Sequence, residues 1–335
     1  MKKIAVLSSL LALLALMAFV QKNNPNGDEP LYSVIVNAKH GFINRSGKMV
    51  IKPQYGCAKE FSEGMAVVEK NDKWGYIDSK GKMVIKPQFD YAFDFHEGVA
   101  VVQVGEKREL IDKKGKRLFI VNSEYQSYMP FVSEGLWAVK KANKWGYVDM
   151  TGKTVIDFQY DKAYPFMEGL AVVDIDGKSG YINTTGKIVI APQYDRANGF
   201  SDDMAIVKVD GKWGVINKKG EIVIEPQFDI MSDFSEGLAG VEINGKRGVI
   251  DKTGKLVVEA KYDIINDFSE GLAAVNIGGM IHGKWGYVDK TGKEVIQLQY
   301  KSAHDFKNGL AYVFLSSDIN AYIDKTGKEV WRSDK

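Results

Sequence analysis

The chain has 335 residues, of which 45% are apolar and 26% are charged, and 34 of them are glycines. This length exceeds that of most single hydrophobic cores and predicts either several domains or a quasi-linear array, while the many glycines indicate frequent tight turns. The formal net charge is only +2. That balance argues against a nucleic-acid-binding protein, because such proteins carry a basic surplus or a basic stripe.

The first twenty residues differ from the rest of the chain. Two lysines precede an apolar run from Ile4 to Val20, and a short basic head before an apolar core is typical of a secretory signal peptide. About 17 apolar residues is also the lower limit for spanning a bilayer, so an uncleaved anchor is the alternative. We expect residues 1–20 to be a signal peptide or N-terminal anchor, 21–30 a linker, and 31–335 an exported array, located in the periplasm, on the cell surface or outside the cell.

A sequence frame recurs nine times along this array. Most copies are 34 residues apart, and they begin at Lys39, Lys73, Lys107, Lys144, Lys178, Lys212, Lys246, Lys284 and Ile319. A period of this length is typical of proteins that repeat one supersecondary unit. Each copy contains three short β-type runs separated by turn residues, so the chain is predicted to be all-β.

The first run of each copy ends in an Asx-x-x-Gly-Lys turn. Its glycine recurs in every copy, including Gly81, Gly152, Gly220 and Gly292, which predicts a positive φ at the end of a short hairpin loop and a structural role. The Asp or Asn three residues earlier can hydrogen-bond the backbone of the turn. The second run often closes with Pro-Gln-aromatic, where proline ends strand pairing because it lacks an N–H donor.

A linker of about a dozen residues then leads to Phe-x-Glu-Gly and the third run. The third run joins the first run of the next copy through a tight turn, which reads Asp176-Gly177 in one copy. Asp-Gly and Asn-Gly are the strongest short signals for a β-hairpin. The predicted folding unit is therefore a three-stranded meander that is offset from the written copies, with residues 31–39 supplying its first strand.

The repeated pattern Lys-Trp-Gly-Tyr-Ile-Asp, Gly-Lys, Val-Ile-x-Pro-Gln-Phe-Asp and Phe-x-Glu-Gly-Leu-Ala-Val-Val resembles the WG (or KWG) repeat family of bacterial proteins. The resemblance covers about residues 39–331. It implies a repeat protein, often exported, with no general activity and no family-wide functional residues.

The tryptophan of this motif is present only in alternate copies, as Trp74, Trp145, Trp213 and Trp285. A row of aromatic rings on a β surface can stack on sugars, but a tryptophan at a fixed strand position more often packs between repeats. We therefore predict a structural role for these four residues and one shared environment that the other copies lack.

Two departures from the repeat are the candidate ligand-binding places, because function tends to lie where a regular scaffold breaks its pattern. The third copy lacks Trp-Gly and Pro-Gln and is rich in aromatic residues, with Tyr125, Tyr128 and Trp137 as candidates. A longer hairpin loop at 276–283 presents the fourth candidate, His282.

No catalytic motif is apparent. The four histidines lie in different copies without ligand spacing, and the single Cys57 has no histidine nearby, so we predict neither a metal site nor a cofactor. The recurring acids follow the repeat, which favours turn and backbone bonding. Paired carboxylates that hydrolyse glycosides are the alternative.

We expect an open, superhelical β-solenoid of about nine meanders. A closed, propeller-like ring is the alternative, although propeller blades usually have four strands and about 40 residues. The predicted function is a non-catalytic binding scaffold of the bacterial envelope or exterior, with protein or glycan partners and no nucleic acid. It would contact a membrane only through an uncleaved N-terminal segment. The alternatives are a carbohydrate-binding or carbohydrate-active protein and a structural or adhesive surface protein.

Overall fold

The computed structural model describes residues 29–121, 125 and 132–334. The predicted signal peptide or anchor, most of the predicted linker and the candidate Tyr128 lie outside these residues. Within the described part of the chain, no helix has the length and apolar character needed to cross a bilayer.

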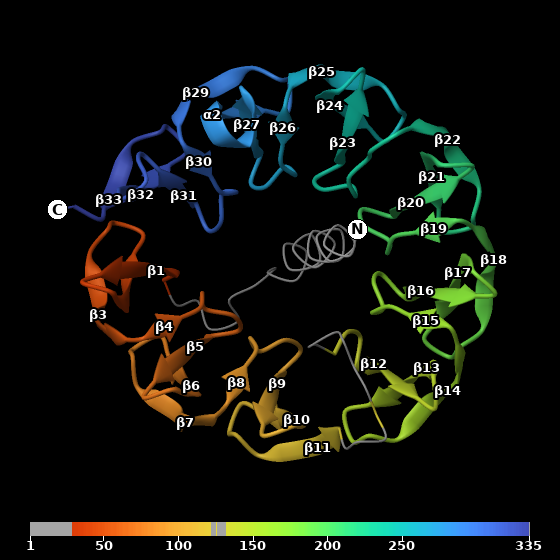
Figure 1. Cartoon of the computed structure of the whole chain (residues 1–335), viewed down its shortest axis with the longest axis horizontal. Helices are drawn as coiled ribbons and strands as arrows, with labels where there is room; N and C mark the ends of the chain where they lie inside the picture. The colour runs from red at the N-terminus through yellow and green to blue at the C-terminus, as the bar shows by residue number, and fades with distance from the viewer. Residues whose placement is uncertain (1–28, 122–124, 126–131, 335) are drawn as a thin grey trace.

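The strands form nine antiparallel sheets, arranged as blades around a common axis (Figure 1). Blades 1 to 3 contain β1 (Leu31–Val36), β2 (Lys39–Asn44), β3 (Met49–Tyr55); β4 (Cys57–Ala58), β5 (Met65–Lys70), β6 (Lys73–Asp78), β7 (Met83–Phe89); β8 (Tyr91–Ala92), β9 (Val99–Val104), β10 (Lys107–Asp112), β11 (Arg117–Val121). Blades 4 to 6 contain β12 (Leu136–Lys141), β13 (Lys144–Asp149), β14 (Thr154–Tyr160); β15 (Lys162–Ala163), β16 (Leu170–Ile175), β17 (Lys178–Asn183), β18 (Ile188–Tyr194); β19 (Arg196–Ala197), β20 (Met204–Val209), β21 (Lys212–Asn217), β22 (Ile222–Phe228).

Blades 7 to 9 contain β23 (Leu238–Ile243), β24 (Lys246–Asp251), β25 (Leu256–Tyr262); β26 (Ile264–Ile265), β27 (Leu272–Ile277), β28 (Lys284–Asp289), β29 (Glu294–Tyr300); β30 (Ser302–Ala303), β31 (Leu310–Phe314), β32 (Asn320–Asp324), β33 (Glu329–Arg332). A single helical turn, α2 (Gly279–His282), lies between β27 and β28.

Six of the nine sheets have four strands, whereas the sequence predicts three strands in each sheet. The additional strand has two residues and comes from the linker before Phe-x-Glu-Gly. In blade 2, for example, Cys57 and Ala58 of β4 pair with Glu69 and Val68 of β5. From the centre of the ring outward we call the strands of a blade A (the two-residue strand), B, C and D (Figure 1). Within the described residues, blades 1, 4 and 7 have no A strand.

The array closes on itself, so the expected open solenoid is wrong and the alternative, a closed propeller-like ring, is confirmed. At the seam between the last and first blades, the Tyr32 hydroxyl donates to the Asn308 carbonyl at 2.7 Å, and the Tyr322 hydroxyl donates to the Ser33 carbonyl at 2.9 Å. The two tyrosine rings pack with their centroids 5.4 Å apart. Because the A strand needs only two residues, a 34-residue unit is long enough to build a complete blade.

The glycine of Trp-Gly permits an irregular D strand. In blade 6, Trp213 pairs with Phe228 and Val215 with Ile224, so three D-strand residues lie opposite Gly214 alone. A Cβ on Gly214 would lie 2.7 Å from both the Ile224 carbonyl oxygen and the backbone nitrogen of Pro226. This bulge also accommodates the proline, which has no N–H to give to a ladder. The glycine of Trp-Gly and the proline of Pro-Gln are therefore both required by the same β-bulge.

Blade 3 shows what happens when both motifs are missing. There Glu109 occupies the glycine position, and the C and D strands pair in step from Arg108 to Leu110, with Glu109 opposite Ile120 and Leu110 opposite Phe119, before the register shifts at Ile111. The Glu109 side chain is only 4% exposed, and its carboxylate binds the Arg117 guanidinium at 2.7 Å. A side chain at this position is thus compatible with a regular D strand and not with the bulge.

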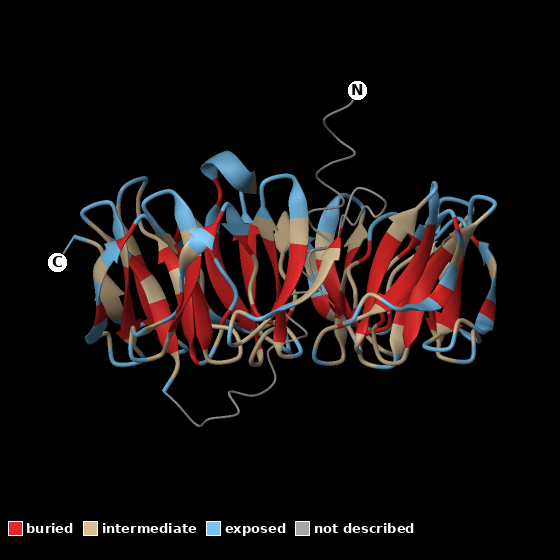
Figure 2. Cartoon of the chain, turned by 90° about the horizontal axis from the view of Figure 1, so that it is seen from below, coloured by how far each residue is buried: buried red, intermediate tan, exposed pale blue. Residues whose placement is uncertain are grey.

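The apolar cores lie between neighbouring blades (Figure 2). Tyr181 of blade 5 is fully buried, its ring packs 4.9 Å from Phe200 of blade 6, and its hydroxyl donates to the Asn198 carbonyl at 2.8 Å. Three other C-strand tyrosines make the same bond to the next blade: Tyr76, Tyr147 and Tyr287. Stability is therefore shared across the junctions between blades, as in other repeat proteins.

Candidate functional site

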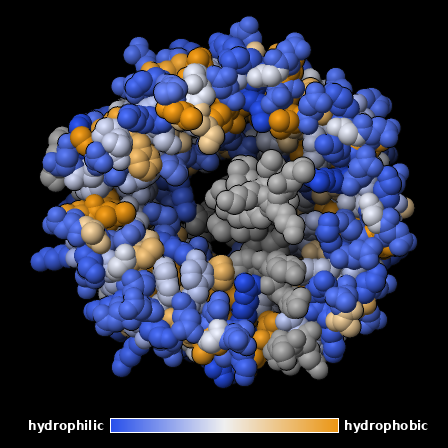
Figure 3. Space-filling model, in the orientation of Figure 1, coloured by the Kyte–Doolittle hydropathy of each residue, from blue (hydrophilic) through white to orange (hydrophobic). Residues whose placement is uncertain are grey.

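The ring has two faces with different connections. The A–B turns (Phe-x-Glu-Gly) and the C–D turns (Asx-x-x-Gly) contact each other on one face, which we call the A–B face. The B–C hairpin turns and the D–A connections contact each other on the opposite face, which we call the B–C face. In the space-filling view the blades surround a central hollow (Figure 3).

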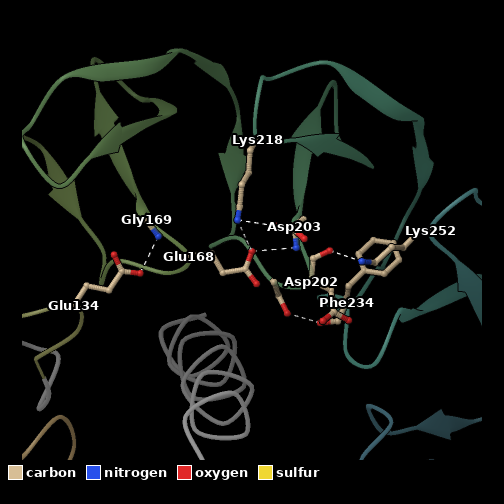
Figure 4. Close-up of polar contacts among 9 residues, drawn as sticks. Glu134, Glu168, Gly169, Asp202, Asp203, Lys218, Phe234 and Lys252 are labelled. Carbon is tan, nitrogen blue, oxygen red and sulfur yellow. Dashed lines mark hydrogen bonds and ion pairs between the residues drawn. The ribbon is translucent and has the colours of Figure 1, made fainter. Parts of the chain in front are cut away.

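A ladder of carboxylates joins the blades on the A–B face (Figure 4). The Glu134 carboxylate accepts the Gly169 N–H at 2.8 Å, and the Glu168 carboxylate accepts the Asp203 N–H of the following blade at 3.0 Å. Equivalent bonds are made by Glu63, Glu97, Asp202, Glu236 and Glu270. The recurring Phe-x-Glu-Gly acid therefore satisfies a backbone donor of its neighbour, which is a structural use of the carboxylate.

Lysines of the C–D turns reinforce this ladder. The Lys218 ammonium of blade 6 lies 3.1 Å from the Glu168 carboxylate and 2.7 Å from that of Asp203 (Figure 4). Lys113, Lys290 and Lys325 bind the corresponding carboxylates of the preceding blade, and Lys252 donates to the Asp202 backbone carbonyl. These contacts neutralise the carboxylates, so the ladder is better suited to holding blades together than to acid–base chemistry.

A second ladder joins the blades on the B–C face. The Asp161 carboxylate binds the Lys144 ammonium of its own repeat at 2.6 Å and accepts the Asp176 N–H of the next blade at 2.8 Å. The hydrogen bond from Lys144 holds the pKa of Asp161 below its usual value. The same lysine–aspartate pair recurs as Lys73–Asp90, Lys178–Asp195, Lys212–Asp229 and Lys246–Asp263.

A carboxylate precedes the phenylalanine of the A–B turn in five blades, as Glu60, Asp94, Asp233, Asp267 and Asp305. Burial raises the pKa of Asp233 to about 6, against the opposing effect of its hydrogen bond from Asn198. The neighbouring Asp267 reinforces the rise. Burial likewise raises the pKa of Asp94 and Glu60.

We predict that Asp233→Asn reduces the pH dependence of stability. Because the pKa of Asp233 is raised from 3.8 to about 6 in the folded state, its stabilising effect is complete below pH 3.8 and is lost as the pH rises through 6. The asparagine variant should lose less unfolding free energy over this interval and be at least as stable at pH 7, as measured by urea denaturation. Asp161→Asn is the control of opposite sign, because its lowered pKa stabilises the fold at neutral pH. An unchanged pH profile for Asp233→Asn would contradict the prediction.

Two candidate residues of the third copy, Tyr125 and Trp137, lie in one apolar cluster and both pack on Phe119. Trp137 is 0% exposed in β12, which removes it as a residue that contacts a ligand from solvent. Tyr125 is half-buried, with its ring centroid 6.1 Å from that of Phe119 and the Lys141 ammonium 5.4 Å from its ring.

The four tryptophans of the Trp-Gly motif occupy one position on the C strand. Trp145 and Trp285 are buried and Trp74 and Trp213 are half-buried. Each lies opposite the last aromatic residue of the D strand. A structural role for them stays a prediction.

The fourth candidate, His282, lies on the one B–C connection of the described chain that contains a helix. Met280 and Ile281 of α2 are 78% and 87% exposed, the highest values among the exposed large apolar residues. We call residues 278–283 the α2 knob. It projects from the B–C face, at the upper edge of Figure 2.

The α2 knob is held firmly on blade 8. The Gly283 N–H donates to the Gly279 carbonyl at 2.9 Å, and the Gly278 N–H donates to the Asp263 carboxylate at 2.7 Å. Gly283 passes directly over Asn276, which is fully buried, so that a Cβ on Gly283 would lie 2.6 Å from the Asn276 amide nitrogen. The knob therefore presents its apolar pair on a fixed base.

No group of three or more His, Cys, Asp or Glu side chains lies close enough to hold a metal ion among the described residues. Cys57 is a half-buried free thiol.

Nine radially arranged antiparallel sheets around a central hollow define the β-propeller class. The family described as "WG containing repeat" matches residues 41–74, 74–107, 110–145, 145–178, 180–213, 213–246, 248–280 and 285–315. The chain therefore belongs to the WG-repeat family, as its motifs predict. Comparison with curated proteins gave no significant match.

Several solved structures are similar in fold. One described as a eukaryotic initiation factor aligns with a TM-score of 0.64 at 10% identity, covering 91% of this chain and 96% of that chain. BamB from Moraxella catarrhalis aligns with a TM-score of 0.45 at 13% identity, covering 90% and 92%. The C-terminal WD40 domain of Sif2 gives 0.44 at 14% identity, covering 78% and 92%. The first similarity supports the fold alone, and the two lower scores add no argument.

Proposed function

We propose that this WG-repeat propeller is a non-catalytic interaction scaffold that binds a protein partner through the α2 knob. The observation that carries the proposal is the exposure of Met280 and Ile281 on a projection that a hydrogen bond ties to Asp263. Burying an apolar side chain of this size stabilises a protein or a complex by about 1.5–3 kcal/mol. A partner that covers Met280 and Ile281 would gain this free energy. Contiguous exposed apolar surface marks interaction sites, and Met280 and Ile281 form an adjacent pair with the highest exposed fractions among the exposed large apolar residues of the described chain.

The regular acids support the non-catalytic part of the proposal. Their carboxylates accept backbone N–H groups of the next blade or bind lysines, so they are committed to the ladders rather than to a reacting bond. Hydrolysis of any member of a glycan panel by the purified full chain would overturn this part.

Site-specific photo-crosslinking tests the partner. A photoreactive amino acid at Ile281 of the full chain, produced in its own bacterium, should form a discrete protein adduct upon illumination. The adduct is identified by mass spectrometry, and the identified protein, once purified, should bind the purified full chain. Lys70, an exposed residue at the same face on blade 2, is the control position and should give no such adduct. Absence of an adduct at Ile281, or adducts to glycan alone, would overturn the proposal.

We further propose that this scaffold works in the envelope or outside the cell, as the basic head and apolar run of residues 1–20 favour. Cell fractionation with N-terminal sequencing of the recovered protein tests this. Recovery from the cytoplasm with the first residues intact would overturn it.

A further inference from the structure

The charges beside the α2 knob differ from those at the same positions in five other blades. In blades 2, 4, 5, 6 and 7, the lysine that opens the C strand pairs with an aspartate 17 residues later, as Lys212 does with Asp229. In blade 8 the corresponding residues are Lys284 and Lys301, both exposed. Among the described residues, the Lys284 ammonium bonds the Gln299 carbonyl, at 3.5 Å, and no carboxylate.

Lys301 thus occupies the aspartate position of the lysine–aspartate pair, and Lys284 directly follows the α2 knob in the chain. Like charges in adjacent positions are unfavourable unless an anionic group comes between them, and the repeat supplies an aspartate at this place in five other blades. In blade 8 Lys301 takes the place of that aspartate.

From this placement we infer that the partner of the α2 knob is a protein surface with an apolar socket rimmed by carboxylates. Met280 and Ile281 enter the socket, while Lys284 and Lys301 meet the acids at its rim. The inference rests on the proposed function and specifies its partner. Complementary rim charges raise the association rate and fix the orientation, whereas the buried apolar anchors supply most of the affinity.

The rest of the B–C face argues for a local protein socket rather than an anionic membrane. The tips of other B–C turns carry exposed acids, namely Asp72, Glu106, Asp176 and Asp210. A flat anionic bilayer that approached this face would meet these carboxylates as well as the knob, and the repulsion would oppose the two lysines. A protein socket needs to contact only blade 8.

The fixed base of the knob favours tight binding by a small contact. Because Asp263 and the Gly279–Gly283 hydrogen bond already hold the backbone, little conformational entropy is lost when the partner binds. Methionine also adapts its unbranched side chain to irregular apolar sockets.

Charge reversal tests this inference separately from the proposed function. With the photoreactive residue at Ile281, the double variant Lys284→Glu/Lys301→Glu should lower the adduct yield and the affinity of the purified full chain for the identified partner by about tenfold or more. The matched control is Lys39→Glu/Lys70→Glu, which makes the same change in net charge at exposed lysines of the same face in blades 1 and 2 and should have little effect. Circular dichroism verifies that both variants fold.

The possible results distinguish the acidic rim from the proposed function. If the adduct forms and charge reversal at Lys284 and Lys301 leaves it unchanged, the acidic rim is wrong while the proposed function stands. If the full chain binds phosphatidylglycerol vesicles and Met280→Asp abolishes that binding, the knob serves a membrane and the inference is overturned. If no adduct forms at Ile281 in the natural chain, the proposed function itself fails.

Discussion

Gly214→Ala is expected to lower the free energy of unfolding by about 3 kcal/mol, because one methyl group would collide with the backbone of the D strand. The added Cβ would lie 2.7 Å from the Ile224 carbonyl oxygen and from the Pro226 nitrogen, and 2.9 Å from the Pro226 Cα. These are backbone atoms, so a rotamer change cannot relieve the contact. The variant can fold only if β22 moves away from β21 or gives up its bulge, and Pro226 restricts both routes. The midpoint of urea denaturation measures the effect.

The matched control is Gly240→Ala, which adds the same methyl group to β23 in the next blade. There the nearest atom would be the Ser232 hydroxyl oxygen at 3.4 Å, and the φ angle of Gly240 is not in the left-handed region. Glycine weakens a strand interior, so this substitution should be neutral or slightly stabilising. Equal losses for Gly214→Ala and Gly240→Ala would show that the bulge is not what requires the Trp-Gly glycine.

The repeat unit and its turns could be predicted from the sequence because turn chemistry is local. The Asp176-Gly177 hairpin, for example, has φ angles of 50° and 78° at its two residues, as a turn with two positive φ values requires. The A strand could not be predicted in the same way, since a two-residue strand shows no periodicity. The linker therefore carries no strand pattern, and the three predicted strands fall short of the four that a propeller blade usually has.

Closure of the ring depends on the angle between blades accumulated around the whole array, which no local pattern encodes. The sequence does differ at the seam between blades 9 and 1. Asn308 replaces the acid of the Phe-x-Glu-Gly turn in the last blade, and there its carbonyl accepts the Tyr32 hydroxyl of the first blade. Where the repeat ends, the residue that would have bonded to a following blade is altered.

The sequence around Trp137 does indicate that this residue is buried, although the preceding residues of the third copy are irregular. Residues 136–139 form a continuous apolar run, and such runs are typical of strands buried on both sides. The structure buries all four residues in β12. By contrast, comparing the copies is enough to single out Lys301, since five other copies have aspartate at its position. Its proposed role in binding a partner, however, depends on the α2 knob, which the sequence does not predict.

Tyr322→Ala is expected to open the ring at the seam and to cost about 3–5 kcal/mol of unfolding free energy, the range for removing a large buried aromatic side chain. The Tyr322 ring packs on Tyr32, Tyr312 and Trp331. Its hydroxyl bonds the Ser33 carbonyl, which would lose that donor in the variant. Hydrogen exchange should become faster in β1 and β31 in particular. Retained protection in both strands alongside a global loss of stability would contradict the prediction.

Tyr181→Ala provides the comparison that isolates the seam. Tyr181 is also fully buried, stacks on a phenylalanine and bonds a carbonyl of the next blade, so its removal should cost a similar free energy. The blades on either side of Tyr181 are joined by the chain itself, which keeps their effective concentration high after the contact weakens. Within the described residues, blades 9 and 1 share neither a chain connection nor a sheet, because β1 pairs with β2 alone and the last blade is completed by its own strands. Tyr181→Ala should therefore loosen blades 5 and 6 while the seam stays protected, whereas Tyr322→Ala separates the first and last blades before the remainder unfolds.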